Sequence, residues 1–403
     1  MKIKIVFIVI DGLGDKPIQA LGNKTPLGAA KTPNLDWLAK NGICGLVVPF
    51  KFPWQKYPES DICHLALFGY DPKIYYLGRG PYEVVGAGMQ IKEGDVALRA
   101  NFATVSTGFK VIDRRAGRIS ETQSLIKAIS GQKIQGIKFL MKKSFGHRVG
   151  LILMGKNLSA EITDADPKET NKPVKKINPK KKSKEAIFTA RVLNRFLLRC
   201  YQILENHPIN KKRELAGLLP ANFLLVRGAG EFKKTPSFYQ KYKLKACCIA
   251  GGNLYKGIGK ALGMKVLRIK GATGLSNTNL SEKIKTIKES LKKYDFVFCH
   301  IKATDSFAED GNYFGKKKFI EKIDKSLKPI PKLKNTLIVI TGDHSTCSTI
   351  KKHCSVSVPF LIYKSGMKRN GIDKFSELFC KKGKLGKIRQ LNLMAEIQTI
   401  AKD

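Results

Sequence analysis

The chain has 403 residues, of which 43% are hydrophobic and 26% charged, a composition typical of a folded globular protein and not of a disordered chain. Its length suits two domains better than one compact core. No apolar run approaches the ~20 residues that a membrane span needs, so we do not expect a membrane protein.

The formal net charge of +42 is unusual. Lysine and arginine neutralise phosphates, so one interpretation is a polyanion partner such as nucleic acid. The other is a general excess of lysine on solvated faces. Because the lysines are scattered through nearly every predicted helix and no nucleic-acid-binding motif is present, we favour the second interpretation and do not expect nucleic acid as a partner.

The first predicted strand covers residues 3–10, IKIVFIVI, and runs directly into Asp11 and a glycine turn. This basic and apolar start is similar to a secretion signal, but Asp11 interrupts it and no small-residue cleavage site follows. We therefore expect a cytoplasmic protein. A lone aspartate at a strand end is usually only a cap or a turn former, unless ligand-type residues also follow other strands.

Helical spacing begins at Ser60, in the segment PESDICHLALFGYDP. A serine that opens a helix is most often an N-cap. The same position also suits a nucleophile that accepts a phosphoryl group, because the amides at a helix N-terminus stabilise a phosphate. No free histidine base is evident, so a metal ion would have to activate the hydroxyl.

Short apolar runs separated by helical stretches continue along the chain, at residues 147–155, 221–228, 245–252, 294–301, 335–342 and 358–363. This alternation predicts an α/β protein with buried, largely parallel strands. The segment 168–186, KETNKPVKKINPKKKSKEA, contains nothing that can form a core. It is predicted to be an exposed, mobile, basic loop inside a domain.

Acidic residues and histidines follow two of these strands. Asp305 and Glu309 come after the strand at 294–301, Asp343 and His344 come after the strand at 335–342, and His353 lies just beyond. Open α/β sheets bind ligands at the carboxyl ends of their strands, and these side chains suit Mn²⁺, Zn²⁺ or Mg²⁺. One helical turn would place Asp305 and Glu309 on the same face.

The nine cysteines include no C-x-x-C pair, and most lie in apolar contexts such as ACCIA and FVFCH. We predict reduced, buried thiols in a reducing compartment, with neither a disulfide framework nor a zinc cage. The cysteines are Cys44, Cys63, Cys200, Cys247, Cys248, Cys299, Cys347, Cys354 and Cys380.

With these segments in order, the chain resembles the archaeal-type cofactor-independent phosphoglycerate mutases of the alkaline phosphatase superfamily. The likeness covers nearly the whole length. It is carried by DGLGDKPIQALGNKTPLGAAKTPNLDWLAKNGICGL, SDICHLALFGYDP, YYLGRGPYEVVGAG, EGDVALRANFATV, IDRRAGRI, ITDADP, ANFLLVRGAG, GIGKALGM, HIKATD and TGDHST with KKHCS. Long collinear matches of this kind are far more specific than any single motif.

The resemblance implies two divalent metal ions beside a catalytic serine, Ser60. Mn²⁺ or Mg²⁺ is favoured, Zn²⁺ or Co²⁺ is possible, and 2,3-bisphosphoglycerate is not required. One ion would be held by Asp11, Ser60, Asp343 and His344, and the other by Asp305, Glu309 and His353. The implied reaction interconverts 3-phosphoglycerate and 2-phosphoglycerate through a phosphoserine at Ser60.

The substrate carries a phosphate and a carboxylate, both of which arginine can bind bidentately. We rank Arg227 and Lys256 first, because each interrupts an apolar, small-residue segment, and Asp166 is a candidate for orienting the glycerate hydroxyls. The full set of substrate-binding candidates is Arg114, Arg115, Arg118, Arg148, Asp166, Arg227 and Lys256.

The resemblance also implies the domain organisation. Residues 1–75 and 245–403 would form a discontinuous metal-binding domain with an alkaline-phosphatase-like core, a mostly parallel sheet flanked by helices. Residues 76–244 would form an inserted α/β substrate-binding domain that contains the basic loop. The two would have to exclude water around the phosphoserine, or it would hydrolyse.

The sequence departs from the family at several places, and two of these departures put a glutamate near the proposed chemistry. Glu309 stands where the family has histidine, and Glu59 stands where it has glycine before the serine. A glutamate at 309 is compatible with a working site shifted toward Mn²⁺ or Mg²⁺, with a weakened second metal, or with lost activity, and we favour the first. Glu59 either faces solvent or repels an incoming phosphate, and the sequence leaves both open.

Three functions follow from these observations, and we favour the mutase. A metal-dependent phosphatase would share every ligand, with water accepting the phosphoryl group in place of glycerate. A catalytically impaired relative would bind polyanions through its positive charge. The sequence indicates neither the native metal nor an oligomeric state.

Overall fold

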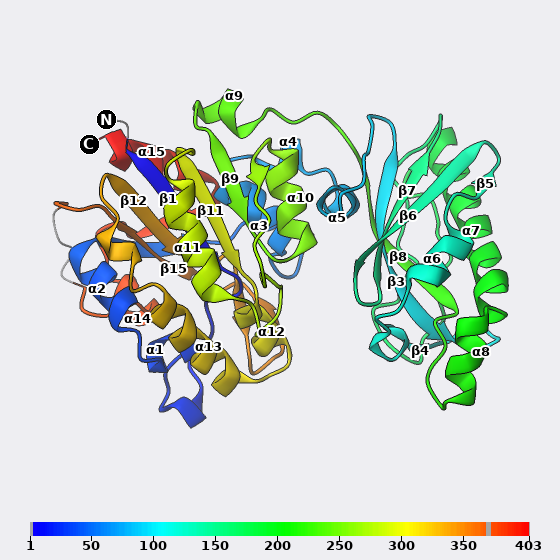
Figure 1. Cartoon of the computed structure of the whole chain (residues 1–403), viewed down its shortest axis with the longest axis horizontal. Coiled ribbons are helices and arrows are strands. Elements are labelled where there is room, and N and C mark those ends of the chain that lie inside the picture. The colour runs from blue at the N-terminus through cyan, green and yellow to red at the C-terminus, as the bar shows by residue number, and fades with distance from the viewer. Residues whose placement is uncertain (1–2, 368–371, 403) are drawn as a thin grey trace. The chain divides into compact units, whose positions relative to one another are not determined.

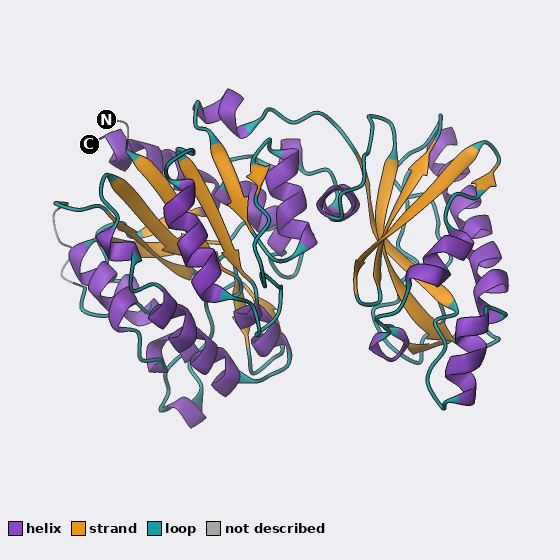
Figure 2. Ribbon diagram, viewed as in Figure 1, coloured by secondary structure: helices purple, strands orange, loops and turns teal. Residues whose placement is uncertain are grey.

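The computed structural model describes residues 3–367 and 372–402. The chain forms two compact units (Figures 1 and 2), the first comprising Met1–Tyr76 with Pro236–Asp403 and the second comprising Leu77–Thr235. The segment 236–244, which we expected in the inserted domain, lies in the first unit. It does so because helix α9 (Phe238–Tyr242) packs there, with the Tyr242 hydroxyl donating to the carbonyl of Phe68 over 2.7 Å.

The first unit contains an eight-stranded, mostly parallel sheet. Five of its seven strand pairs are parallel, and the β12–β15 and β15–β2 pairs are antiparallel. The order is β10 (Lys265–Val266), β9 (Ala246–Ile249), β11 (Phe296–Ile301), β1 (Lys4–Ile10), β12 (Thr336–Thr341), β15 (Val358–Tyr363), β2 (Ile43–Val48) and β16 (Lys387–Arg389). The predicted strand at 3–10 is therefore central, which explains its unbroken run of Val, Ile and Phe.

Helices cover both faces of this sheet (Figure 1). Alternate residues of a strand point to opposite faces, so Val6 and Ile8 lie in the core under α2, α11 and α13. Phe7 faces the other way and meets Phe68, which follows α3, with ring centroids 6.1 Å apart. The helices of this unit are α1 (Pro26–Ala29), α2 (Pro33–Asn41), α3 (Ser60–Leu67), α4 (Pro72–Tyr75), α9, α10 (Asn253–Ala261), α11 (Leu280–Ser290), α12 (Ala303–Glu309), α13 (Tyr313–Ser326), α14 (Glu377–Cys380) and α15 (Leu393–Lys402).

The second unit contains a six-stranded antiparallel sheet. Its strands are β4 (Val111–Asp113), β3 (Val96–Val105), β7 (Arg148–Met154), β6 (Ile137–Phe145) and β5 (Lys133–Ile134) in that order, with β8 (Phe223–Glu231) also paired to β3. The expectation of parallel strands at 147–155 and 221–228 is therefore wrong. A two-residue turn joins β6 to β7, and a connection this short forces antiparallel pairing.

Helices also pack on this antiparallel sheet, so the unit is of mixed α and β structure. They are α5 (Arg79–Gly86), α6 (Gln123–Ile129), α7 (Lys184–Glu205) and α8 (Pro208–Leu215). The long helix α7 buries its apolar stripe against the sheet, where the ring of Phe196 stacks on Phe139 with centroids 4.0 Å apart. No helix in the described part of either unit has the length and apolar content to cross a bilayer.

The basic segment 168–186 is tied to the second unit by hydrogen bonds. Backbone bonds connect Lys175 to Ala165 and Lys180 to Glu161. Ile177 is buried, and the amide side chain of Asn194 on α7 bonds both its N–H and its carbonyl. The expectation of a segment with no core contact is wrong because a single isoleucine between lysines supplies an apolar anchor.

Candidate active site

Parallel pairing brings the candidate ligands to one edge of the first unit's sheet. Val9 of β1 lies opposite His300 of β11 on one side and Thr341 of β12 on the other. The residues that follow these three strands therefore lie next to one another at the carboxyl edge. Asp11 and Asp343 both occupy this edge, as the strand-end pattern predicted, and both are fully buried.

The first ligand group surrounds Nε2 of His344. This nitrogen lies 3.3 Å from Oδ2 of Asp343, 3.7 Å from Oδ1 of Asp11 and 3.0 Å from Oγ of Ser60. Neither Asp11 Oδ1 nor Asp343 Oδ2 has a hydrogen-bond partner among the described residues, although both are buried. A buried carboxylate oxygen is costly to leave without a donor or a cation, so this arrangement fits a metal ion.

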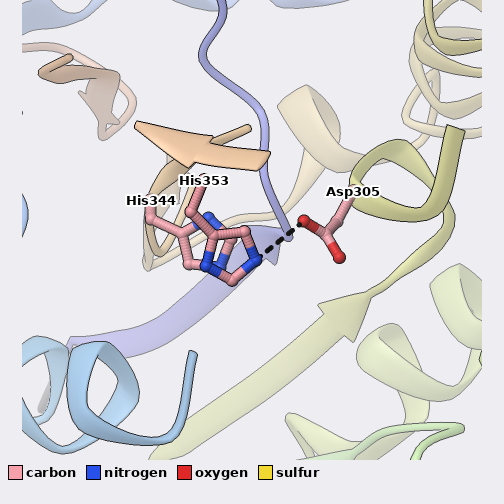
Figure 3. Close-up of side chains that lie close together, drawn as sticks. All are labelled: Asp305, His344 and His353. Atoms are coloured by element: carbon pink, nitrogen blue, oxygen red, sulfur yellow. Dashed lines mark ion pairs between the residues drawn. The ribbon is translucent and has the colours of Figure 1, made fainter. Parts of the chain in front are cut away.

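The second ligand group lies beside the first and shares His344 with it. Asp305 of α12 and His353 of β14 (Lys352–Cys354) form an ion pair, with Nε2 of His353 3.4 Å from Oδ1 of Asp305 (Figure 3). The rings of His344 and His353 stack with centroids 3.8 Å apart. Glu309 lies one turn after Asp305 on α12, with Oε1 3.9 Å from His353 Nε2, so the two carboxylates share a helix face as predicted.

Ser60 is the first residue of α3, and Glu59 occupies the N-cap position. The structure thus excludes the N-cap interpretation for Ser60. Its hydroxyl points instead to His344, and the residue is 4% exposed. Glu59 is only partly buried and its side chain makes no capping hydrogen bond.

Sequence reasoning missed Lys302, the first residue after β11. Its ammonium group lies 3.2 Å from Oδ2 of Asp11 and also pairs with Asp305, so it links the two ligand groups. Lysine is not a metal ligand in this setting, so the search for ligand types passed over it. Its place directly after a central strand was the signal that could have found it.

Burial and neighbouring charges shift the pKa values of these groups. Burial opposes ionisation of Asp11, but Lys302 and His300 outweigh it and hold the pKa of Asp11 well below its usual range. Burial and the charge of Asp11 raise the pKa of Asp343. Burial lowers the pKa of His344, which keeps its imidazole neutral and able to bind a cation.

His353 behaves differently from His344. Burial disfavours its charged form, but the hydrogen bond and the charge of Asp305 raise the pKa of His353 to about 9. The Nδ1 atom of His353 also lies 2.7 Å from the carbonyl of Pro58, which fixes the ring with Nε2 toward Asp305. A carbonyl acceptor on the second nitrogen is the usual support for a metal-binding histidine.

A second layer of polar contacts holds the loops that carry the ligands. Lys316 of α13 is completely buried and donates to the carbonyls of Gly14 and Thr346, each over 2.9 Å, and to Oδ2 of Asp15 over 3.0 Å. Asp15 in turn accepts from the amide and hydroxyl of Ser348. This cluster joins the segment after Asp11 to the segment after His344.

The segment after His344 forms a two-stranded hairpin of β13 (Ser345–Cys347) and β14. A disulfide joins Cys347 to Cys354, so the prediction that all nine cysteines are reduced thiols is wrong for this pair. The pairing of two strands brings the cysteines within reach of each other, and spacing alone did not show it. The other seven cysteines are buried and free, as predicted.

The second unit gathers arginines around two buried carboxylates. Arg114 binds Asp166 bidentately, with distances of 3.0 and 2.7 Å, and Arg227 lies 3.6 Å from the same carboxylate. Nearby, Arg99 of β3 lies 3.6 Å from Glu83 of α5. The pKa of Arg227 is lowered to about 10, mainly by burial and next by the positive charge of Arg79.

This arginine cluster carries more positive than negative charge. Arg148, which sequence reasoning had selected, adds to the positive field at Arg99 and Arg227. Sequence reasoning missed Arg79 and Arg99. Arg99 is 6% exposed in the all-buried strand β3, and a charge that interrupts an apolar strand was the signal that could have found it.

Comparison with known proteins identifies the family. A family model described as 2,3-bisphosphoglycerate-independent phosphoglycerate mutase matches residues 39–210. A protein of Methanocaldococcus jannaschii named 2,3-bisphosphoglycerate-independent phosphoglycerate mutase 1 is 44% identical over 396 residues, which are 97% of this chain and 95% of that protein. A protein of the same name from Archaeoglobus fulgidus is 44% identical over 408 residues, 99% and 98% of the two chains. The chain belongs to this family of isomerases.

Solved structures agree with this membership in the mutase family. A cofactor-independent phosphoglycerate mutase from Thermoplasma acidophilum matches with a TM-score of 0.70 at 38% identity, and the match covers all of both chains. The protein PH0037 from Pyrococcus horikoshii matches with a TM-score of 0.86 at 33% identity, covering 100% of this chain and 98% of the other. The α/β fold expected from the resemblance to these mutases is thereby confirmed.

Three further residues were selected as substrate-binding candidates: Arg115, Arg118 and Lys256. Arg115 and Arg118 are exposed at the turn after β4. Lys256 lies on α10 in the first unit, partly buried, directly after Tyr255. Tyr255 was not selected, yet its hydroxyl donates to Oδ2 of Asp11.

Proposed function

We propose that this chain interconverts 3-phosphoglycerate and 2-phosphoglycerate through a phosphoserine at Ser60. The observation that carries the proposal is the placement of the Ser60 hydroxyl. It lies at the first residue of a helix, beside His344 and beside buried oxygens of Asp11 and Asp343 that have no hydrogen-bond partner among the described residues. The chain also belongs to the cofactor-independent mutase family.

Two divalent cations are part of this proposal. Asp11, Ser60, Asp343 and His344 would hold one, and Asp305, Glu309 and His353 would hold the other. When bound, the cations would polarise the serine hydroxyl and offset the charge of the transferring phosphoryl group. The five carboxylate and hydroxyl donors favour Mn²⁺ or Mg²⁺, and the two histidines also suit Zn²⁺ or Co²⁺.

The protein's own residues carry the reaction steps. Oγ of Ser60 gives up its proton and forms a bond to phosphorus as the bond between phosphorus and the glycerate oxygen breaks, and the departing oxygen takes up a proton. The backbone amides at the start of α3 are oriented to stabilise the phosphate on Ser60. The other glycerate hydroxyl then attacks the phosphoserine, and Ser60 regains its proton.

The second unit supplies the groups that fit the rest of the substrate. Arg227, Arg148 and Arg114 are suited to bind a carboxylate or phosphate, and Asp166 is suited to accept from a glycerate hydroxyl. Asp166 is already held in place by Arg114, so a substrate would find it oriented. A lysine in place of these arginines would lose the planar fork that matches both anions.

The test is a mutase assay on metal-stripped protein restored separately with Mn²⁺, Mg²⁺, Zn²⁺ or Co²⁺, with free phosphate measured in the same samples. Ser60→Ala is the diagnostic variant, and Ser106→Ala, on an exposed turn of the second unit, is its matched control. We expect metal-dependent 2-phosphoglycerate formation that Ser60→Ala abolishes and the control retains. Release of phosphate without 2-phosphoglycerate would show a phosphatase, and no turnover with any cation would overturn the proposal.

A further inference from the structure

The hairpin β13–β14 positions residues of both ligand groups. His344 directly precedes β13, and His353 lies in the middle of β14. Thr346 pairs with His353 across the hairpin, and its hydroxyl donates to Oδ1 of Asp305 over 2.6 Å. A displacement of β14 would therefore move His353 away from Asp305 while leaving His344 in place.

The two strands of the hairpin are anchored unequally. β13 is held by Lys316 and by a backbone bond from Thr346 to Gly14. The Ser345 hydroxyl donates over 2.9 Å to the carbonyl of Val356, which lies just after β14, so this bond joins the two sides of the hairpin. The side-chain anchor of β14 is His353 itself, through the carbonyl of Pro58 and the ion pair with Asp305. A hairpin of three residues per strand is marginally stable by itself, so β14 needs a further restraint.

That restraint is the Cys347–Cys354 disulfide. It joins the last residue of β13 to the residue after His353, with Cα atoms 5.9 Å apart. Both cysteines are buried, at 0% and 4% exposure. Where the compartment is reducing, disulfides are typically catalytic or redox-sensing and not structural.

We propose that the Cys347–Cys354 disulfide is a redox-sensitive positioning device for His353. When it is intact, the second ligand group binds its cation, and when it is reduced, β14 loosens and the affinity for that cation falls. This inference rests on the proposed function, because it concerns the second cation of that site. The inference adds that the affinity for the second cation depends on the thiol–disulfide state of the surroundings.

The reductant belongs to the class of dithiols. One of its thiolates attacks a sulfur of the disulfide, forming a mixed disulfide and releasing the other cysteine as a thiol. The second thiol of the reductant then displaces the remaining cysteine. The protein gains two electrons and two protons, and the dithiol becomes an intramolecular disulfide. The exposed turn at 349–351 connects the two strands, so opening of the hairpin at this end would give the reductant access.

The experiment measures Mn²⁺ binding to the full chain in both redox states. One sample is treated with a dithiol, which is then removed without oxygen, and the other stays oxidised. Mn²⁺ is the probe because it is a hard ion, and freed thiols would not bind it in competition. We expect two ions per oxidised chain, and a Kd for the second ion raised roughly tenfold or more by reduction, the range found when supports of metal ligands are lost.

Two variants make the test specific. The double variant Cys347→Ser with Cys354→Ser should bind Mn²⁺ as the reduced protein does and should not respond to the dithiol. Cys200→Ser, at a buried free cysteine in the second unit, is the control. Dithiol treatment should raise its Kd for the second Mn²⁺ as much as it does in the natural sequence.

Equal Kd values for the second ion in the oxidised and reduced protein would overturn the inference, and so would two free thiols at 347 and 354 after air oxidation. If mutase activity persisted in that case, the proposed function would stand and only the inference would fall. Absence of a second ion in both states would overturn the inference together with the two-cation part of the proposed function.

Discussion

Replacing Lys316 by methionine should destabilise the first unit more than any exposed lysine substitution. The side chain of Lys316 is completely buried, and its ammonium donates to two carbonyls and to the carboxylate of Asp15. Burial lowers the pKa of Lys316, while the charge of Asp15 opposes that shift. Methionine keeps an apolar stem of similar length but supplies neither the charge nor the three hydrogen bonds.

The expected loss in the free energy of unfolding is about 3–5 kcal/mol, the cost of removing one partner of a buried ion pair. Asp15 is 1% exposed, so its carboxylate would stay buried without its cation. The carbonyls of Gly14 and Thr346 would each lose a donor, at about 1–3 kcal/mol for a buried group, although these losses are not additive.

Urea unfolding followed by tryptophan fluorescence measures the stability of the first unit, which contains Lys316 and both tryptophans, Trp37 and Trp54. The matched control is Lys317→Met. Lys317 is partly exposed and its ammonium lies 3.7 Å from Glu321, so we expect a loss of at most about 1 kcal/mol. Adding Asp15→Asn to Lys316→Met should restore part of the stability. A loss below about 1 kcal/mol for Lys316→Met, or one equal to that of Lys317→Met, would refute the reasoning.

Three further predictions concern the second cation, the arginine cluster and the core of the second unit. Because the pKa of His353 is raised to about 9, a proton competes with the cation for this histidine below that pH. The affinity for the second Mn²⁺ should therefore rise roughly tenfold per pH unit from pH 7 to 9 and then level off. An affinity that stays constant over this range would contradict the prediction. Arg227→Lys should lower kcat/KM about ten- to hundredfold through the loss of charged hydrogen bonds. Arg115→Lys, at an exposed arginine, should have little effect. Equal effects of the two variants would exclude Arg227 as a substrate-binding residue. Phe196→Ala removes the stack on Phe139 and should lower the free energy of unfolding of the second unit by about 3–5 kcal/mol, measured by calorimetry. The unfolding transition followed by tryptophan fluorescence should not change. A shift of that transition would show that the two units unfold together.

The positions of the chemistry-bearing residues were predictable from the sequence because parallel strands share an edge. With residues 3–10, 294–301 and 335–342 as buried parallel strands, Asp11, Asp305 and Asp343 all follow strands whose carboxyl ends lie at the same edge of the sheet. The helical spacing of Asp305 and Glu309 likewise follows from a local period. Collinear motifs added the family, which neither composition nor periodicity indicates.

Only the tertiary structure decided which distant groups meet. An apolar run does not encode the direction of its partner, so β7 and β8 became antiparallel against expectation. The Cys347–Cys354 disulfide depends on hairpin register, and the place of Lys302 between two carboxylates depends on how the segments after β1 and β11 meet. Local patterns determined the strands and the residues at their ends, because hydrophobic period and turn chemistry act over a few residues. Long-range pairing and burial determined which side chains touch, because a contact between distant residues depends on every element packed around it.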